Sequence, residues 1–148
     1  MSLSAHAHPA TLTRRAATLR LPGTREGCGE AREFTRRTLG EWELGHRRDD
    51  ALSIVSELVA NAVVHARPDG AVPGHEPDVW LKLTLRGAHL VCSVTDSGRG
   101  LPEFARNESQ WSEHGRGLRI VDALAEHWGW TRRAFIGKTV WAMLPTRA

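Results

Sequence analysis

The sequence predicts an α+β fold, in which a mostly antiparallel sheet carries helices on one face. Three observations support this fold class. Residues 49–66 repeat apolar side chains at helical spacing, whereas residues 79–86 alternate apolar and polar side chains, as a half-buried strand does. The expected element order is strand, helix, helix, strand, strand, loop, helix, strand, strand, and the adjacent strands in this order pair most simply as antiparallel hairpins.

A single folded domain is expected over residues 14–148, after a tail at residues 1–13 that lacks periodicity. Residues 16–21 favour a short first strand, which the following Pro-Gly pair would end. A helix is predicted over residues 24–39, because its apolar side chains recur at helical spacing. The residues at this spacing are Ala31, Phe34, Thr38 and Leu39.

The strongest helix signal covers residues 49–66, which begin with aspartates that can cap the first turn. Its core-facing side chains would be Leu52, Val55, Leu58, Val59 and Ala62. Residues 67–78 hold three prolines and two glycines, so a loop is expected there. Residues 79–86 and 90–94 would then form a hairpin around the turn at residues 87–89.

Residues 96–116 show no periodicity, and so long a loop inside a compact domain usually binds or covers something. A third helix is predicted over residues 117–127. Its core-facing side chains would be Leu118, Val121, Leu124 and Ala125. Residues 128–135 and 139–144 would form the closing hairpin around residues 136–138.

Composition disfavours several classes of protein. Hydrophobic residues make up 41% and charged residues 25% of the chain, which fits a folded protein without membrane spans. The 20 Lys and Arg residues are scattered, without the basic stripe of a nucleic-acid-binding surface. The two cysteines lack metal-ligand spacing, and no signal peptide is recognisable. We therefore expect a cytoplasmic protein that contacts neither nucleic acid nor membrane directly.

Glu57 and Asn61 form the first of three candidate functional clusters. Because they are four residues apart on a predicted helix, they lie one above the other, beside its apolar stripe. An amide oxygen at such a position can complete the oxygen shell of a magnesium ion that holds phosphate. A carboxylate one turn earlier can accept a proton from an attacking hydroxyl group. Alone, the pair also fits an ordinary solvated helix surface.

The other two clusters follow in the chain. Asp96 comes directly after an apolar run and can accept a hydrogen bond from an adenine amino group, and Gly98 and Gly100 let the backbone approach a flat base. The stretch at residues 115–118 precedes the third helix, where free backbone N–H groups favour phosphate. Taken singly, the first of these also fits an ordinary turn and the second an ordinary helix start.

In this order, the three clusters resemble the nucleotide site of the gyrase, heat-shock chaperone, histidine kinase and MutL (GHKL) superfamily. The matching stretches are residues 56–62, 96–100 and 115–118. Residues 137–141, Gly-Lys-Thr-Val-Trp, resemble the last motif of that family. The resemblance covers about residues 24–144 and implies a Bergerat-type two-layer sandwich, with a mixed, mostly antiparallel sheet, that binds ATP and Mg²⁺.

The resemblance also implies roles for individual residues. Glu57 would be the catalytic base, and Asn61 would be the ligand of Mg²⁺. The residues that would bind ATP are Asn61, Asp96, Gly98, Gly100, Gly115, Arg116, Gly117, Leu118 and Thr139, of which Asp96 would accept from adenine and Thr139 would help to hold it, usually through water. Residues 101–114 would form a lid, with Arg106 and Arg116 as contacts of the γ-phosphate.

Small size and the pattern Ser-Glu-Leu-Val-x-Asn-Ala-x-x-His-Ala at residues 56–66 resemble the anti-sigma-factor serine/threonine kinases in particular. The implied partners are a sigma factor and an anti-anti-sigma (STAS-type) protein, which the kinase would phosphorylate. Arg32 resembles an arginine that contacts the partner, and a homodimer is compatible with the family. The alternative is a binding module that holds ATP and Mg²⁺ as a switch and sequesters a sigma factor or other regulatory partner without phosphate transfer.

Overall fold

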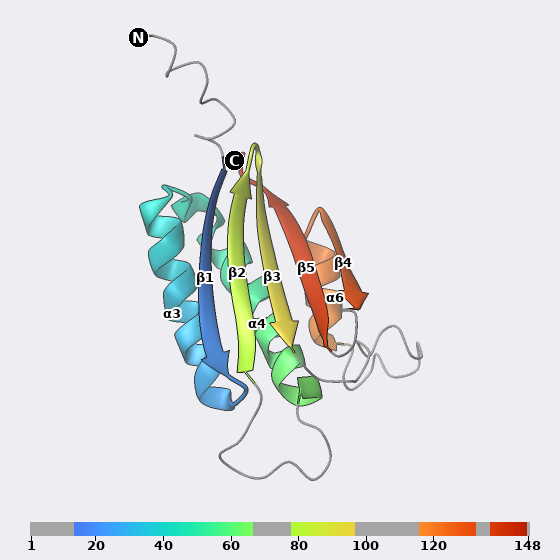
Figure 1. The fold of residues 1–148 in the computed structure, drawn as a ribbon. Coiled ribbons are helices and arrows are strands. Elements are labelled where there is room, and N and C mark those ends of the chain that lie inside the picture. The colour runs from blue at the N-terminus through green and yellow to red at the C-terminus, as the bar shows by residue number, and fades with distance from the viewer. Residues whose placement is uncertain (1–13, 67–77, 97–115, 133–136, 148) are drawn as a thin grey trace.

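Five strands form one sheet in the order β1-β2-β3-β5-β4, and every pairing in it is antiparallel (Figure 1). The strands are β1 (Arg14–Pro22), β2 (Asp78–Arg86), β3 (His89–Asp96), β4 (His127–Arg132) and β5 (Lys138–Pro145). This computed structural model describes residues 14–66, 78–96, 116–132 and 137–147. The predicted fold class is confirmed.

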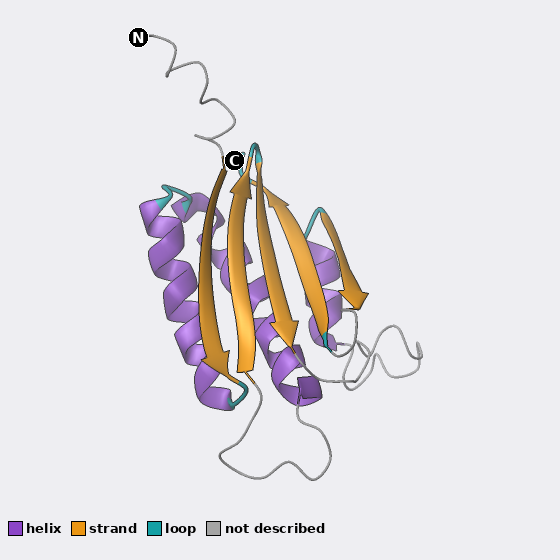
Figure 2. Cartoon of the chain, viewed as in Figure 1, coloured by secondary structure: helices purple, strands orange, loops and turns teal. Residues whose placement is uncertain are grey.

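The helices α3 (Arg25–Glu41), α4 (Arg48–Ala66) and α6 (Arg116–Leu124) cover one face of the sheet, here called the inner face (Figure 2). The helix α4 is central, because it packs against α3, α6 and the sheet, most closely at β3. The five predicted core residues of α4 are all buried, and Ala51 and Ile54 are buried as well. The additional burial follows from the two flanking helices, which leave α4 little exposed surface.

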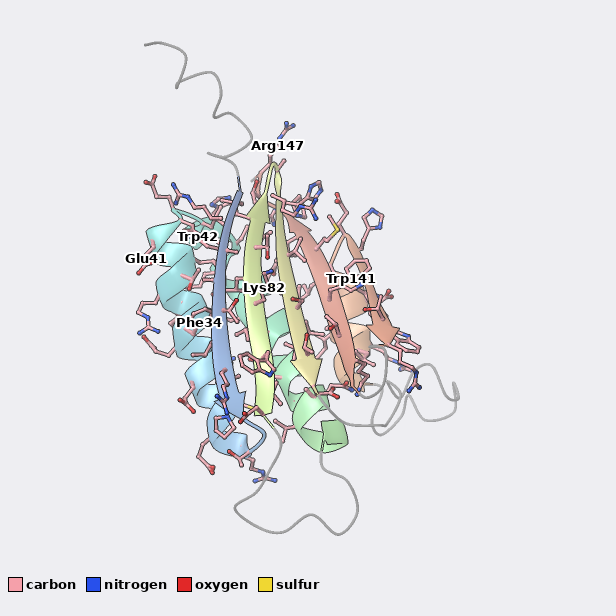
Figure 3. All side chains as sticks on the ribbon, viewed as in Figure 1. Phe34, Glu41, Trp42, Lys82, Trp141 and Arg147 are labelled. Atoms are coloured by element: carbon pink, nitrogen blue, oxygen red, sulfur yellow. The ribbon has the colours of Figure 1, made fainter. Side chains whose placement is uncertain are left out.

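Alternation along the strands separates the inner face from the outer face, which the described helices leave uncovered. In β2, Val79, Leu81 and Leu83 are fully buried, whereas Trp80 between them is 43% exposed. Lys82 and Trp141, both labelled in Figure 3, belong to the outer face by the same alternation. The core therefore lies in one layer, between the sheet and the helices.

Predicted boundaries differ from the observed ones mainly where tertiary hydrogen bonds decide them. The third helix ends at Leu124 rather than at residue 127. The Glu126 N–H already donates to the Met143 carbonyl at 2.8 Å, so the chain turns there into β4. Asp96 is the last residue of β3 instead of the first loop residue, and a short 3₁₀ helix, η1 (Gly45–Arg47), was not predicted.

The outer face includes one close contact between β4 and β5. Gly129 pairs with Trp141, and a Cβ atom placed on Gly129 would lie 2.9 Å from Cζ2 of the Trp141 ring. The indole ring therefore occupies the space that a side chain at residue 129 would need.

None of the helices in the described segments combines the length and apolarity that a membrane span requires.

The end of α3 places a residue other than glycine in a left-handed conformation. The N–H of Leu44 donates to the Leu39 carbonyl at 2.8 Å and the N–H of Glu43 donates to the Gly40 carbonyl at 3.2 Å. This is a Schellman cap, which favours glycine at the position of Glu43, where φ is 58°. An L-residue is strained there, because its Cβ crowds the neighbouring carbonyl group.

We expect Glu43→Gly to raise the free energy of unfolding by about 0.5–1 kcal/mol, because glycine removes this strain at some cost in backbone entropy. Urea unfolding of both proteins measures the difference. Glu41→Gly, inside the same last turn, is the control and should instead destabilise the protein by a similar amount, about 0.5–1 kcal/mol. Equal destabilisation by both changes would contradict the explanation.

Candidate functional site

Four element ends meet at one end of the domain, the lower end in Figure 1. They are the end of α4, the end of β3, the start of β5 and the start of α6. The residues predicted to contact the nucleotide come from these same ends: Asn61 from α4, Asp96 from β3, Thr139 from β5, and Arg116, Gly117 and Leu118 from α6. The fold therefore gathers segments that are distant in sequence at one end of the sheet.

Asp96 forms a buried ion pair with Lys138, its cross-strand partner. The Lys138 Nζ lies 2.9 Å from the Asp96 Oδ2, and the side chains are 2% and 1% exposed. Both residues face the helices, because Val94 and Val140, two positions along each strand, are also buried. The predicted adenine acceptor thus lies on the inner face, beside a lysine that was not predicted to belong to the site.

Thr139 lies on the other face of the sheet. Its Oγ1 is 2.8 Å from the Oγ1 of Thr95, its cross-strand neighbour, and both threonines alternate with the inward-facing Asp96 and Lys138. The structure therefore does not bring the Thr139 side chain together with Asp96. Gly137, whose φ is 96°, directly precedes β5. Lys138 is the first residue of β5 and points inward.

Asn61 has an unsatisfied oxygen atom. Its Oδ1 is buried and, among the described residues, has no hydrogen-bond partner. A buried amide oxygen without a partner costs about 1–3 kcal/mol, so such an atom needs an explanation. A hard cation such as Mg²⁺ binds amide oxygens, and this atom fits that role. Within the described part of the chain, no three or more His, Cys, Asp or Glu residues form a group that could hold a metal ion.

Glu57 lies one turn before Asn61 and faces the start of α3. Burial raises the pKa of Cys28 on α3, the positive charge of Arg25 opposes this rise, and the negative charge of Glu57 adds to it. Glu57 is therefore close enough to Cys28 for its charge to be felt there. The Glu57 residue is half-buried.

Arg32 is held against α4. Its Nη1 donates a hydrogen bond to the Ser56 Oγ at 2.6 Å, and Ser56 directly precedes Glu57 in the sequence. The side chain is half-buried, so the predicted partner-contact residue is partly engaged within the protein. Its guanidinium group still has further N–H donors, because one of the five is used in this bond.

The remaining predicted residues lie at or beyond the edge of the described segments. Gly98, Gly100, Arg106, Gly115 and the lid at residues 101–114 lie outside the described residues, as does the tail at residues 1–13. Arg116 and Gly117 form the first turn of α6. Leu118 is 1% exposed, so its side chain serves the core.

Most of this sequence matches a known protein family. The model of the histidine kinase-, DNA gyrase B- and HSP90-like ATPases matches residues 46–148, which is more than half of the chain. The chain belongs to this ATPase family. The match includes α4 and everything after it, and so covers all the predicted ATP-binding residues of the ATPase domain.

A solved structure shares the fold of this ATPase-family chain. It is a chain in the crystal structure of the SiaB–SiaC complex from Pseudomonas aeruginosa, with a TM-score of 0.65 and 15% sequence identity. The similarity covers 97% of each chain, so it includes β1 and α3, which precede the region matched by the ATPase family. No curated protein sequence matches the chain significantly.

Lys138, which pairs with Asp96, was not among the site residues predicted from the sequence. A charged residue such as Lys138 at the start of a strand usually faces solvent. The adjacent Thr139, in contrast, matches the family motif at residues 137–141. A signal was present, because Lys138, Val140, Ala142 and Leu144 share one parity, and the last three are apolar. That parity already placed Lys138 on the core side and Thr139 on the opposite side.

Proposed function

We propose that this chain binds ATP with Mg²⁺ and transfers the γ-phosphate to a serine or threonine of a partner protein, as an anti-sigma-factor-type kinase. The observation that carries the proposal is the unpartnered, buried Oδ1 of Asn61, one helical turn after Glu57. Both residues belong to the helix that packs against β3, the strand that ends at Asp96. Membership of an ATPase family supports the nucleotide.

Each group would act according to its chemistry. Asp96 would accept a hydrogen bond from the adenine amino group, since a carboxylate is purely an acceptor when ionised. The backbone N–H groups at the start of α6 would hold phosphate oxygens. Asn61 would hold the metal ion, which neutralises phosphate charge when bound. Glu57 would orient the attacking hydroxyl group and accept its proton.

The proposed partners are a sigma factor and an anti-anti-sigma protein. The similarity in fold to a chain that is found in a complex of two proteins, SiaB and SiaC, supports a role in binding another protein. Arg32 remains our proposed partner contact, through the donors that Ser56 does not use. A homodimer and a cytoplasmic location also remain proposals.

Thermal unfolding with ATP, in the presence and absence of Mg²⁺, tests nucleotide binding. A ligand at a hundredfold excess over its Kd stabilises the folded state by about 2.7 kcal/mol, which raises the Tm of a domain of this size by roughly 5–10 °C. We expect this shift for ATP with Mg²⁺ in the unmodified protein. Asn61→Ala should lose most of the shift, because the metal ligand is removed.

Asp49→Asn is a matched control on the same helix, since the Asp49 side chain is 96% exposed. It should keep the full Mg²⁺-dependent shift. The proposal of ATP binding fails if the unmodified protein shows no shift with ATP and Mg²⁺. The assignment of Asn61 fails if Asn61→Ala responds to Mg²⁺ as the control does.

A further inference from the structure

The ammonium group of Lys138 is buried with hydrogen-bonding capacity to spare. It has three N–H donors, and among the described residues its hydrogen-bond partner is Asp96 alone. The residue is 2% exposed, so little water reaches it. A buried ammonium with donors left over is costly unless further acceptors reach it. The position therefore favours a ligand that brings an acceptor to the Asp96–Lys138 pair.

We propose that Lys138 is a base-specificity residue, whose ammonium group donates a hydrogen bond to the ring nitrogen N1 of adenine. This inference rests on the proposed binding of ATP. The pair presents one acceptor, the Asp96 carboxylate, beside one donor, the Lys138 Nζ. Adenine presents the complementary pattern, because its 6-amino group donates and its adjacent N1 accepts.

The same pair would reject guanine in that orientation. Guanine has an acceptor oxygen at C6 and an N–H group at N1, so Asp96 would face an acceptor and Lys138 would face a donor. Leaving buried polar groups opposed in this way costs far more than losing a contact to water. Thr139 cannot supply the donor from its side chain, because that side chain lies on the outer face against Thr95.

A purely structural ion pair is the competing explanation. In that case Lys138 would only neutralise Asp96, and the identity of the atom at position 1 of the base would not matter. The distinction can be measured with 1-deaza-ATP, in which a C–H group replaces N1 while the 6-amino group remains. The unmodified protein is used, so the comparison does not depend on whether a variant folds.

Isothermal titration calorimetry with Mg²⁺ should show 1-deaza-ATP binding about 10–100-fold more weakly than ATP to the unmodified protein, as expected for a lost hydrogen bond to a buried charged group. GTP should bind still more weakly. Lys138→Met, which keeps a long side chain but no donor, should bind ATP and 1-deaza-ATP equally. Lys82→Met, on the exposed outer face, is the control and should keep the discrimination.

Equal binding of ATP and 1-deaza-ATP to the unmodified protein overturns the role of Lys138 and leaves ATP binding intact. Discrimination that persists in a folded Lys138→Met variant also overturns it, because another group must then read N1. If the unmodified protein binds neither nucleotide, the proposed function itself fails and this inference fails with it. Loss of discrimination in Lys138→Met alone supports the assignment.

Discussion

Asp96→Ala is expected to lower the free energy of unfolding by about 3–5 kcal/mol, because it leaves the Lys138 ammonium group buried without its counterion. The effect should be large even without nucleotide, since both side chains are almost inaccessible to water. For a domain of this size, such a loss corresponds to a fall in Tm of roughly 6–20 °C. Urea unfolding and thermal unfolding both measure it.

Two further variants test whether the loss of stability arises because the ion pair is buried. Asp78→Ala removes an even closer but exposed ion pair with Arg20, in which the Arg20 and Asp78 side chains are 64% and 36% exposed, and should cost about 0–1 kcal/mol. The double variant Asp96→Ala/Lys138→Met removes both buried charges and should recover most of the lost stability. If Asp96→Ala costs no more than Asp78→Ala, the buried pair contributes far less than its environment indicates.

Glu57→Gln is expected to lower phosphate transfer by about 10²- to 10⁴-fold, because glutamine keeps the shape of the side chain but cannot accept the proton of the attacking hydroxyl group. Binding of ATP with Mg²⁺ should stay within about twofold of the unmodified protein, since uniform binding is not altered. Transfer of labelled γ-phosphate to a co-encoded anti-anti-sigma protein measures the first quantity, and calorimetry measures the second.

Glu30→Gln, an exposed change on α3, should leave both quantities unchanged. Full phosphate transfer by Glu57→Gln would remove Glu57 from the catalytic role. An unmodified protein that binds ATP with Mg²⁺ but transfers no phosphate would instead favour the binding module, which holds nucleotide as a switch and sequesters its partner. Phosphate transfer by the unmodified protein therefore separates the two functions, and Glu57→Gln tests the residue responsible for it.

Periodicity predicted most of the fold because the burial pattern is simple. The core-facing residues expected in α4 are all buried, and the hairpin of β2 and β3 has the predicted alternation. The boundaries were less predictable, because long-range hydrogen bonds set them. The N–H of Glu126 contacts β5, and no local pattern at the end of α6 indicates that bond.

The sequence suggested which residue types belong to the candidate site, but it did not show which of their side chains pair with each other. Asn61 and Asp96 carry chemistry that spacing alone could suggest, whereas the pairing of Asp96 with Lys138 depends on the register of β3 and β5. The alternation of residues 138–144 indicated which of them face the core, but the motif does not contain the register that brings Lys138 opposite Asp96. The family motif favoured Thr139, and the sheet places Lys138 beside the carboxylate.

The contact between Gly129 and Trp141 has a consequence for how this sheet can evolve. Because the indole ring fills the space above Gly129, a side chain at residue 129 becomes acceptable only after Trp141 moves or shrinks. Relatives that have lost the glycine are therefore expected to carry a smaller residue at the position of Trp141. These two positions should vary together in an alignment, although they lie 12 residues apart and on different strands.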